Sequence, residues 1–505
     1  MKIDLRAKIL KKKRGLFYTP SEVFRKCVLP KLKDSLWDYT WIDLYCGKGD
    51  LIIPIVKAIE ENNRNKFFSE HIRCFDIDEH ALSLFADRLR QIGVKDELIK
   101  KNLIQLDTLK EFPSFEYSYP LYHITNPPYL YKGYMPKTEK TRDLLQYFKG
   151  KREPLQDLYQ VALFNDLMKG LDKMIYIIPT NFLFGDANAN HIRQLIFKYY
   201  NLVDLFIFEK KVFSDTGTNT CVCFFEKKAI PSEADQIVYA TKISKDGEKK
   251  RAYKLSKKFK WRAGSEFYEF IEQFKADNPL HFEYYLLKKD VEANKGEYEV
   301  TLLDVNNYSK VVAKVNKELH DRIKSNVLFL KTLDTGRFEG RAGLYECKKV
   351  FGVDGIMVSK DYTYRTHPIQ IFFKSRLSYD EQVFVKDWFN YILNKLRKEY
   401  DSDFMTTYRE STRYYTRKYL GLKQARAIIE TCPLSDVNVE EVKHIHSLEP
   451  WIENYLAKKE IKVKDVKNNL RYWDTSLQTP KPLNRRKLSC RCRNNRPANE
   501  SNQGY

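Results

Sequence analysis

The chain has 505 residues, of which 43% are hydrophobic and 14% aromatic, and it carries a formal net charge of +22. This length exceeds that of one typical domain, so two or three domains are expected. The hydrophobic content excludes a disordered chain, and the excess positive charge favours a polyanionic partner, above all nucleic acid.

Nine cysteines are scattered over the chain, an odd number that is typical of reduced thiols and not of a disulfide framework. Cys490 and Cys492 have no second pair or histidine at zinc-ligand spacing, so no metal site is expected. No apolar run has the length of a membrane span or a signal-peptide core. We therefore expect a cytoplasmic protein without membrane contact.

Residues 1–14 form a basic arm, and an amphipathic helix is predicted to follow it. Thr19 suits the N-cap of this helix, and Pro20 suits its first helical position.

Residues 39–45 are predicted to form a strand that leads through Gly47 and Gly49 into a helical pattern over 51–60. Glycine at this turn lets the backbone approach a ligand closely, and Asp43 can accept a hydrogen bond from a cationic ammonium group. No phosphate-loop pattern is present.

Two further strands, over 71–75 and 102–106, end at Asp76 and Asp107. A carboxylate at the end of the second strand can accept from both hydroxyls of a ribose, whereas Asp78 suits a helix N-cap. The alternation of strands and helices predicts an α/β fold with a mostly parallel sheet, on which these carboxylates gather at the carboxyl ends of strands.

The strand predicted over 121–125 stops at Asn126-Pro127-Pro128-Tyr129, because proline cannot donate to a sheet ladder. The Asn126 amide oxygen and the Pro127 carbonyl are two acceptors that suit the two N–H groups of an exocyclic amine. Tyr129 offers a flat face on which a base can stack.

At this motif the chain resembles the amino-methyltransferases that methylate adenine N6 in DNA with S-adenosylmethionine. Because the cofactor motifs precede Asn-Pro-Pro-Tyr, the resemblance is to the gamma class of type II restriction-modification systems, and it covers about residues 15–228. It implies a Rossmann-like catalytic domain, although Leu44 stands where many members have proline. The cofactor-binding residues that it implies are Thr19, Pro20, Asp43, Gly47, Gly49, Asp76 and Asp107.

The resemblance implies that Thr19 contacts the methionine end of the cofactor, that Asp76 binds the ribose, and that Asp107 accepts a hydrogen bond from the adenine amino group. The family also closes its catalytic domain with a hairpin whose loop carries an aromatic residue that stacks on the flipped base. Here strands are predicted over 202–208 and 220–226, and Phe213 lies between them. The alternative, that Phe213 anchors its loop to the core, stays open.

Residues 131–152 form a long predicted loop of the kind that covers a site or contacts a partner. The region 229–479 is expected to be the target-recognition, DNA-binding domain, and 480–505 a disordered basic tail. Within that region, 249–262 and 406–426 interleave basic and aromatic residues that suit phosphates and bases. A solvated surface with tyrosines packed inward is an equal alternative for each segment.

The hypothesis is site-specific DNA adenine N6-methylation, with duplex DNA as partner and a cognate restriction endonuclease for the same site as an implication of the resemblance. RNA or protein-glutamine methylation is one alternative, and a catalytically inert DNA-binding protein is another. A fused restriction nuclease is a third, because Asp334, Glu346 and Lys348 imitate the metal-site pattern of many nucleases.

Overall fold

The computed structural model describes residues 23–137, 139–185, 188–210, 219–335, 340–359, 368–410, 416–442, 445 and 447–460. Thr19, Pro20 and Phe213 lie outside these residues, as do the predicted arm and tail. By its internal contacts the chain divides into Met1–Ile452 and Glu453–Tyr505, and the described part of the second unit, 453–460, is helical. None of the helices in the described ranges combines the length and hydropathy needed to span a membrane.

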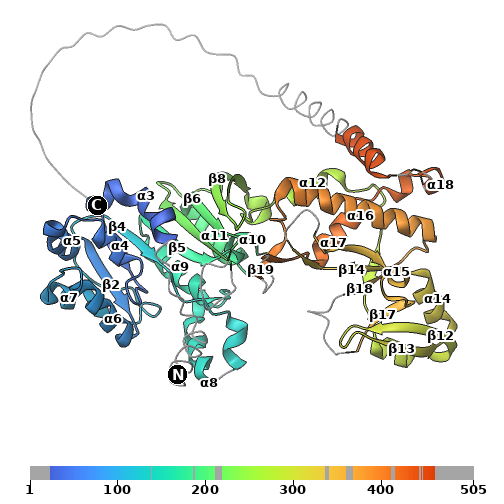
Figure 1. Cartoon of the computed structure of the whole chain (residues 1–505), viewed down its shortest axis with the longest axis horizontal. Coiled ribbons are helices and arrows are strands. Elements are labelled where there is room, and N and C mark those ends of the chain that lie inside the picture. Colours follow the sequence, from blue (N-terminus) through green and yellow to red (C-terminus); the bar gives the residue numbers. More distant parts are fainter. Residues whose placement is uncertain are drawn as a thin grey trace, which may run out of the picture. The chain divides into compact units, whose positions relative to one another are not determined.

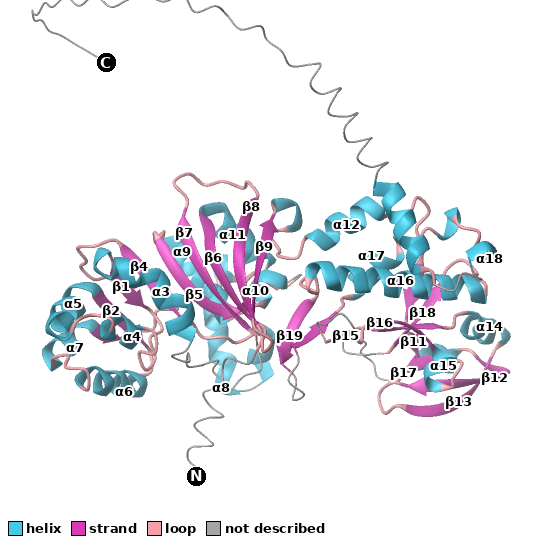
Figure 2. Ribbon diagram, turned by 45° about the horizontal axis from the view of Figure 1, so that its top comes forward, coloured by secondary structure: helices cyan, strands magenta, loops and turns pink. Residues whose placement is uncertain are grey.

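Nine strands form one sheet in the first unit: β1 (Thr40–Asp43), β2 (Ile72–Asp76), β3 (Leu103–Gln105), β4 (Leu121–Thr125), β5 (Lys173–Pro179), β6 (Tyr200–Phe208), β7 (Thr220–Lys227), β8 (Gln236–Ile243) and β9 (Glu248–Leu255). Their order is β3-β2-β1-β4-β5-β7-β6-β8-β9. Figure 1 shows the sheet in the colours of the sequence, and Figure 2 labels all of its strands except β3. The first five in this order are parallel, and β7 runs antiparallel between β5 and β6.

Helices pack on both faces of this sheet, which therefore separates two hydrophobic cores. One core includes side chains of η1 (Phe24–Val28), α3 (Leu29–Leu32), η2 (Lys33–Asp38), α4 (Ile52–Lys57), α5 (Arg64–His71), α6 (Glu79–Arg90) and α7 (Asp96–Asn102). The other includes side chains of α9 (Leu158–Lys169), α10 (Asn181–Phe184) and α11 (Asn190–Tyr199). In β5, Ile175 and Ile177 join the first core while Tyr176 and Ile178 join the second, as expected for a strand covered on both faces.

The α/β prediction is confirmed, and so is the N-cap at Asp78, whose carboxylate accepts from the His80 and Ala81 N–H groups. The segment 131–152, predicted as a loop, instead contains η4 (Lys132–Lys137), α8 (Glu139–Arg142), η5 (Asp143–Tyr147) and η6 (Gly150–Arg152). The sheet also continues past residue 228 through β8 and β9, because β8 pairs in parallel with β6.

After β9 the chain forms smaller sheets whose strands are β10 (Phe282–Tyr284), β11 (Leu286–Leu287), β12 (Lys295–Asp304), β13 (Ser309–Val315), β14 (Leu328–Lys331), β15 (Leu333–Asp334), β16 (Gly343–Glu346), β17 (Gly355–Val358), β18 (Ile369–Phe373), β19 (Thr406–Glu410) and β20 (Thr416–Tyr419). Their orders are β10-β18-β14-β16, β11-β17-β12-β13 and β15-β20-β19. The helices of this region are η7 (Lys257–Phe259), α12 (Glu266–Phe274), α13 (Lys288–Ala293), α14 (Lys317–Ser325), α15 (Cys347–Phe351), α16 (Tyr379–Tyr400), α17 (Leu422–Ile429), η8 (Leu434–Asp436) and α18 (Val439–Val442).

Helix α16 is the longest of these, and a capping box fixes its start. Ser378 Oγ accepts from the Glu381 N–H at 3.2 Å, and the Glu381 carboxylate accepts from the Ser378 N–H at 2.6 Å. The helix ends at Tyr400, and its C-cap Asp401 has a left-handed backbone conformation.

Candidate active site

A cavity of about 670 Å³ lies where the parallel strands of the large sheet end. This is the edge at which ligands bind to open α/β sheets. The sequence-predicted residues that line the cavity are Asp43, Gly47, Asp76, Asp107, Asn126 and Pro127. Residues separated in the sequence are therefore brought together as expected.

Asp43 ends β1 and is only 1% exposed. Its Oδ1 accepts a hydrogen bond from the Tyr45 N–H at 3.1 Å and another from Thr125 Oγ1 at 2.9 Å. Burial raises the pKa of the Asp43 carboxyl from its usual 3.8 to about 7, and the nearby His123 opposes this rise only in part. A cationic ligand group in the cavity would favour the ionised carboxylate.

The loop after β1 turns through two glycines in the left-handed region, Gly47 with φ 51° and Gly49 with φ 76°. A Cβ on Gly49 would lie 2.1 Å from the Phe85 ring, so no larger residue fits without a shift. The Asp76 carboxylate ties the end of β2 to this loop, because it accepts from the Gly47 N–H at 2.7 Å and from the Asp78 N–H at 2.9 Å. Burial raises the pKa of Asp76 as well.

Asp107 lines the cavity from beyond β3, and its Oδ2 accepts a hydrogen bond from the Tyr147 hydroxyl at 2.8 Å. Tyr147 belongs to η5, is 5% exposed and lines the same cavity, as does Leu144. The helical segment after Asn-Pro-Pro-Tyr therefore covers part of the cavity. Sequence reasoning missed Tyr147, because nothing distinguishes it from the other tyrosines of that segment.

Asn126 and Pro127 lie at the cavity, but the Tyr129 ring does not line it. Tyr129 is 8% exposed and meets the Tyr159 ring edge-on, with centroids 6.4 Å apart. The single proton of its hydroxyl is shared between two acceptors, the Asn126 amide oxygen and the Ile177 carbonyl, the latter at 2.5 Å. Tyr129 thus orients the Asn126 amide, and its stacking on a base stays a prediction.

A buried polar chain, which the sequence reasoning missed, joins β4, β5 and α9 to the residue after β1. His123 Nδ1 is 2.5 Å from the Asp166 carboxylate, which also accepts from the Tyr176 hydroxyl. The Leu44 N–H donates to His123 Nε2 at 3.3 Å, so the proton sits on Nδ1 and is donated to Asp166. These contacts tie β1 to β4 directly before Asn126. A histidine inside an apolar strand was the available signal.

Basic side chains of the segment 249–262 form ion pairs with acidic side chains of the same protein. These ion pairs weaken the interpretation of the segment as a DNA-binding surface. Its ion pairs join Lys249 to Asp401, Arg251 to Asp401, Asp403 and Glu266, Lys254 to Glu269, Lys257 to Glu233 and Lys258 to Glu272. In 406–426, β19 and β20 form an antiparallel hairpin. The side chains of 407–416 lie outside the described part of the chain.

The three residues of the nuclease-like pattern are engaged elsewhere. Asp334 binds the Arg397 guanidinium, Glu346 contacts Lys349, Lys386 and Tyr379, and Lys348 lies 3.8 Å from Asp354. Within the described ranges, no group of three His, Cys, Asp or Glu side chains could hold a metal ion. The contacts give Asp334 and Glu346 structural ion-pair partners, so they do not support the nuclease alternative.

The sequence profile of a protein family described as N-6 DNA Methylase matches residues 3–321. This match is longer than the stretch over which the motifs alone carry a resemblance. A search of curated proteins found no match.

Three solved structures show the extent of structural similarity. The methyltransferase subunit of a type I restriction-modification system from Streptococcus thermophilus is 18% identical with a TM-score of 0.31, covering 47% of this chain and 50% of that one. A DrdV–DNA complex is 12% identical with a TM-score of 0.44, covering 77% and 55%. A nuclease-deletion mutant of the Type ISP enzyme LlaGI, bound to a DNA substrate mimic, is 10% identical with a TM-score of 0.46, covering 83% and 47%. The chain thus spans about half the length of each, and similarity of this size does not define an activity.

Proposed function

Because the chain belongs to the N-6 DNA methylase family, we propose that it is a site-specific adenine N6-methyltransferase that uses S-adenosylmethionine and acts on duplex DNA. The observation that carries the proposal is one cavity lined both by the Asn126-Pro127 acceptors and by three carboxylates at strand ends. Motif order assigns it to the gamma class.

The polar residues that line the cavity fit the polar groups of S-adenosylmethionine. Asp43 would hold the ammonium of its methionine end, Asp76 the ribose hydroxyls, and Asp107 the adenine amino group. Gly47 would bring the loop close to the ligand, and Gly49 is proposed to help by allowing the turn that packs against Phe85. Thr19 and Pro20 are proposed to contact the methionine end. When bound, S-adenosylmethionine supplies an electrophilic methyl group on its sulfonium.

The protein's part in the chemistry is to orient a weakly basic amine. The Asn126 amide oxygen has two lone pairs, and Tyr129 donates to one of them. The other lone pair and the Pro127 carbonyl would each accept one amino hydrogen. Those two hydrogen bonds favour a pyramidal nitrogen whose lone pair faces the methyl group, so orientation and acceptor dipoles replace a strong base.

The target adenine must leave the duplex to reach this cavity, since its amino group is paired and stacked there. Tyr129 and Phe213 are proposed to stack on the flipped base. The region 229–479 would recognise the DNA site, and the net charge of +22 supports binding to phosphates. A cognate restriction endonuclease for the same site and a cytoplasmic location complete the proposal.

The test is tritiated methyl transfer from S-adenosylmethionine to unmethylated genomic DNA, followed by nucleoside analysis of the product. N6-methyladenine is expected, and Asn126→Ala should lower its formation at least about 100-fold. Calorimetry should find the affinity of that variant for the cofactor unchanged. Label on RNA or on glutamine, with none on DNA, would refute the substrate, and full turnover by Asn126→Ala would refute the chemistry.

A further inference from the structure

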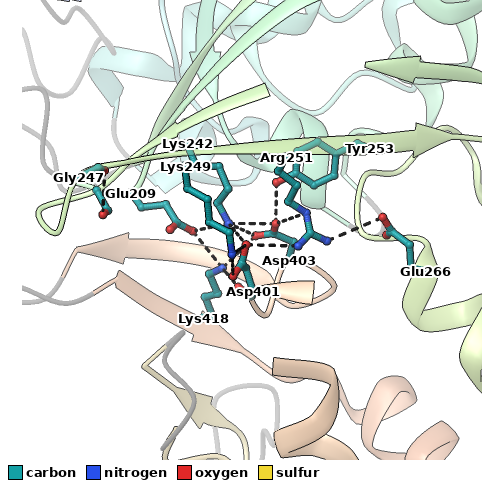
Figure 3. Close-up of polar contacts among 11 residues, drawn as sticks. Glu209, Lys242, Gly247, Lys249, Arg251, Tyr253, Glu266, Asp401, Asp403 and Lys418 are labelled. Carbon is teal, nitrogen blue, oxygen red and sulfur yellow. Dashed lines mark hydrogen bonds and ion pairs between the residues drawn. The ribbon is translucent and has the colours of Figure 1, made fainter. Parts of the chain in front are cut away.

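A cluster of charged residues joins the large sheet to the chain that follows α16 (Figure 3). β8 and β9 supply cations, the turn after α16 supplies carboxylates, and β20 supplies a lysine. We name it the junction cluster, and its four cations and four carboxylates are Lys242, Lys249, Arg251, Lys418, Glu209, Glu266, Asp401 and Asp403. Its formal charges therefore balance.

The β8–β9 hairpin needs these carboxylates. Lys242 on β8 is the register partner of Lys249 on β9, and Arg251 follows two residues later on the same face. Like charges placed opposite each other destabilise a pair of strands. Carboxylates from other parts of the chain offset this repulsion when they reach this face of the β8–β9 hairpin.

Asp403 is the centre of the cluster and is 1% exposed. Its carboxylate lies 2.9 Å from Lys242 Nζ, 3.2 Å from Lys418 Nζ and 3.2 Å from Arg251 Nε. The Tyr253 hydroxyl also donates to it at 2.6 Å. Burial alone would raise the pKa of Asp403, but the three cations outweigh burial and hold it well below its usual range. The group is therefore ionised at neutral pH.

Lys418 extends the cluster to the β19–β20 hairpin and to the end of β6. It is 1% exposed, and its ammonium donates to the Asp401 carbonyl at 2.8 Å and lies 3.2 Å from the Glu209 carboxylate. Glu209 comes directly after β6, and its N–H donates to the Ile243 carbonyl at 2.9 Å. One buried lysine thus links three parts of the chain.

The turn that carries Asp401 and Asp403 is held in a costly conformation. Asp401 has φ 52° and Ser402 has φ 59°, a left-handed geometry that non-glycine residues rarely adopt. Gly264 allows this turn to approach, because a Cβ there would lie 2.7 Å from the Asp403 backbone. Such conformations persist only where the surroundings determine them fully.

A second contact fixes the same turn next to the cavity-forming domain. Arg262 donates to the Phe184 carbonyl, at the end of α10, at 2.8 Å and to the Phe404 carbonyl at 2.6 Å. The Phe404 ring stacks on Phe267 with centroids 4.7 Å apart. Helix α10 also contacts β19. The turn after α16 and the β19–β20 hairpin are therefore held to the large sheet at more than one point.

We propose that the junction cluster sets the position of the β19–β20 hairpin relative to the large sheet whose strand ends form the methyl-transfer cavity, and that Lys418 is the positioning residue through which this hairpin affects the choice of DNA site. The hairpin belongs to the segment 406–426, whose interleaved basic and aromatic residues suit DNA. This inference rests on the proposed function. Buried ion pairs suit the task, because each charge must meet its partner at hydrogen-bond distance, whereas an apolar contact tolerates sliding. Lys418 fixes the hairpin from a strand that pairs directly with β19.

The experiment compares Lys418→Met with Lys249→Met, since Lys249 belongs to the same cluster but its side chain is 63% exposed. Each enzyme methylates unmethylated genomic DNA, and sequencing that detects N6-methyladenine maps the products. For Lys418→Met we expect the share of methylation outside the wild-type motif to rise at least about fivefold, with a higher KM for DNA. The cofactor affinity should stay unchanged, Lys249→Met should match the wild type, and Lys418→Arg should restore most of the specificity.

If Lys418→Met does not fold, Glu209→Gln decides the question, because Glu209 is the partner of Lys418 whose side chain is 25% exposed. It should relax the specificity in the same direction. A wild-type methylation pattern in both variants would overturn the inference, as would equal effects of Lys418→Met and Lys249→Met. A wild-type enzyme that methylates no DNA would instead refute the proposed function, so the two failures are distinguishable.

Discussion

The pH dependence of cofactor binding follows from the burial of Asp43. With a pKa of about 7, this carboxyl is about 3% ionised at pH 5.5 and about half ionised at pH 7. A ligand ammonium binds the ionised form, and an α-amino group, which titrates near about 7.7–8.0, stays largely protonated at both values. The affinity for S-adenosylmethionine should therefore rise about fifteenfold from pH 5.5 to pH 7.

Isothermal titration calorimetry at the two pH values measures this ratio without any turnover. Asp43→Asn should bind more weakly at pH 7 and lose most of the pH dependence. Asp157→Asn is the matched control: burial also raises the pKa of Asp157 to about 7, but this carboxyl accepts from the Leu130 N–H at 2.9 Å and does not line the cavity. The control should keep the fifteenfold ratio. Equal wild-type affinities at both pH values, or an unchanged ratio in Asp43→Asn, would refute the reasoning.

Three further substitutions test particular contacts. Tyr129→Phe removes the hydroxyl that orients Asn126, so kcat should fall about fivefold with little change in KM, which corresponds to about 1 kcal/mol. Single-turnover kinetics measure the rate of methyl transfer, and an unchanged rate would contradict this role of Tyr129. Gly49→Ala drives a methyl group into Phe85 and should lower the free energy of unfolding by about 1–3 kcal/mol, measurable by urea denaturation. Asp78→Ala removes the N-cap of α6 and should cost about 1 kcal/mol in the same assay, whereas His80→Ala at an exposed position should cost less.

The sequence was sufficient to predict the strand ends and six of the residues that line the cavity. Asp43, Asp76 and Asn126 each follow a short apolar run, and parallel strands bring such positions to one edge whatever the helices between them do. Local patterns therefore predicted a site made by distant residues, because the topology supplies the distance.

Hydrogen-bond and ion-pair partners that only the tertiary structure brings together could not be predicted in this way. Asp166 looks like any acidic residue of a helix until β4 and β5 place His123 and Tyr176 against it. Arg251 and Lys249 suggest a nucleic-acid surface in the sequence, yet carboxylates some 150 residues later neutralise them, and no local pattern encodes that separation. The sequence of 131–152 predicts a loop, because the helical elements in it, including the one that carries Tyr147, are too short for a helical periodicity to be visible.

The position of β7 in the sheet affects how the chain folds during synthesis and which fragments of it can fold. β7 follows both β5 and β6 in the chain but lies between them, and those two strands form no ladder with each other. During synthesis β5 therefore emerges from the ribosome with one bare edge, and it is an almost wholly apolar strand that waits for residues 220–227. A fragment that stops before Thr220 would keep that edge unpaired and prone to aggregation, so a shortened chain has to include β7.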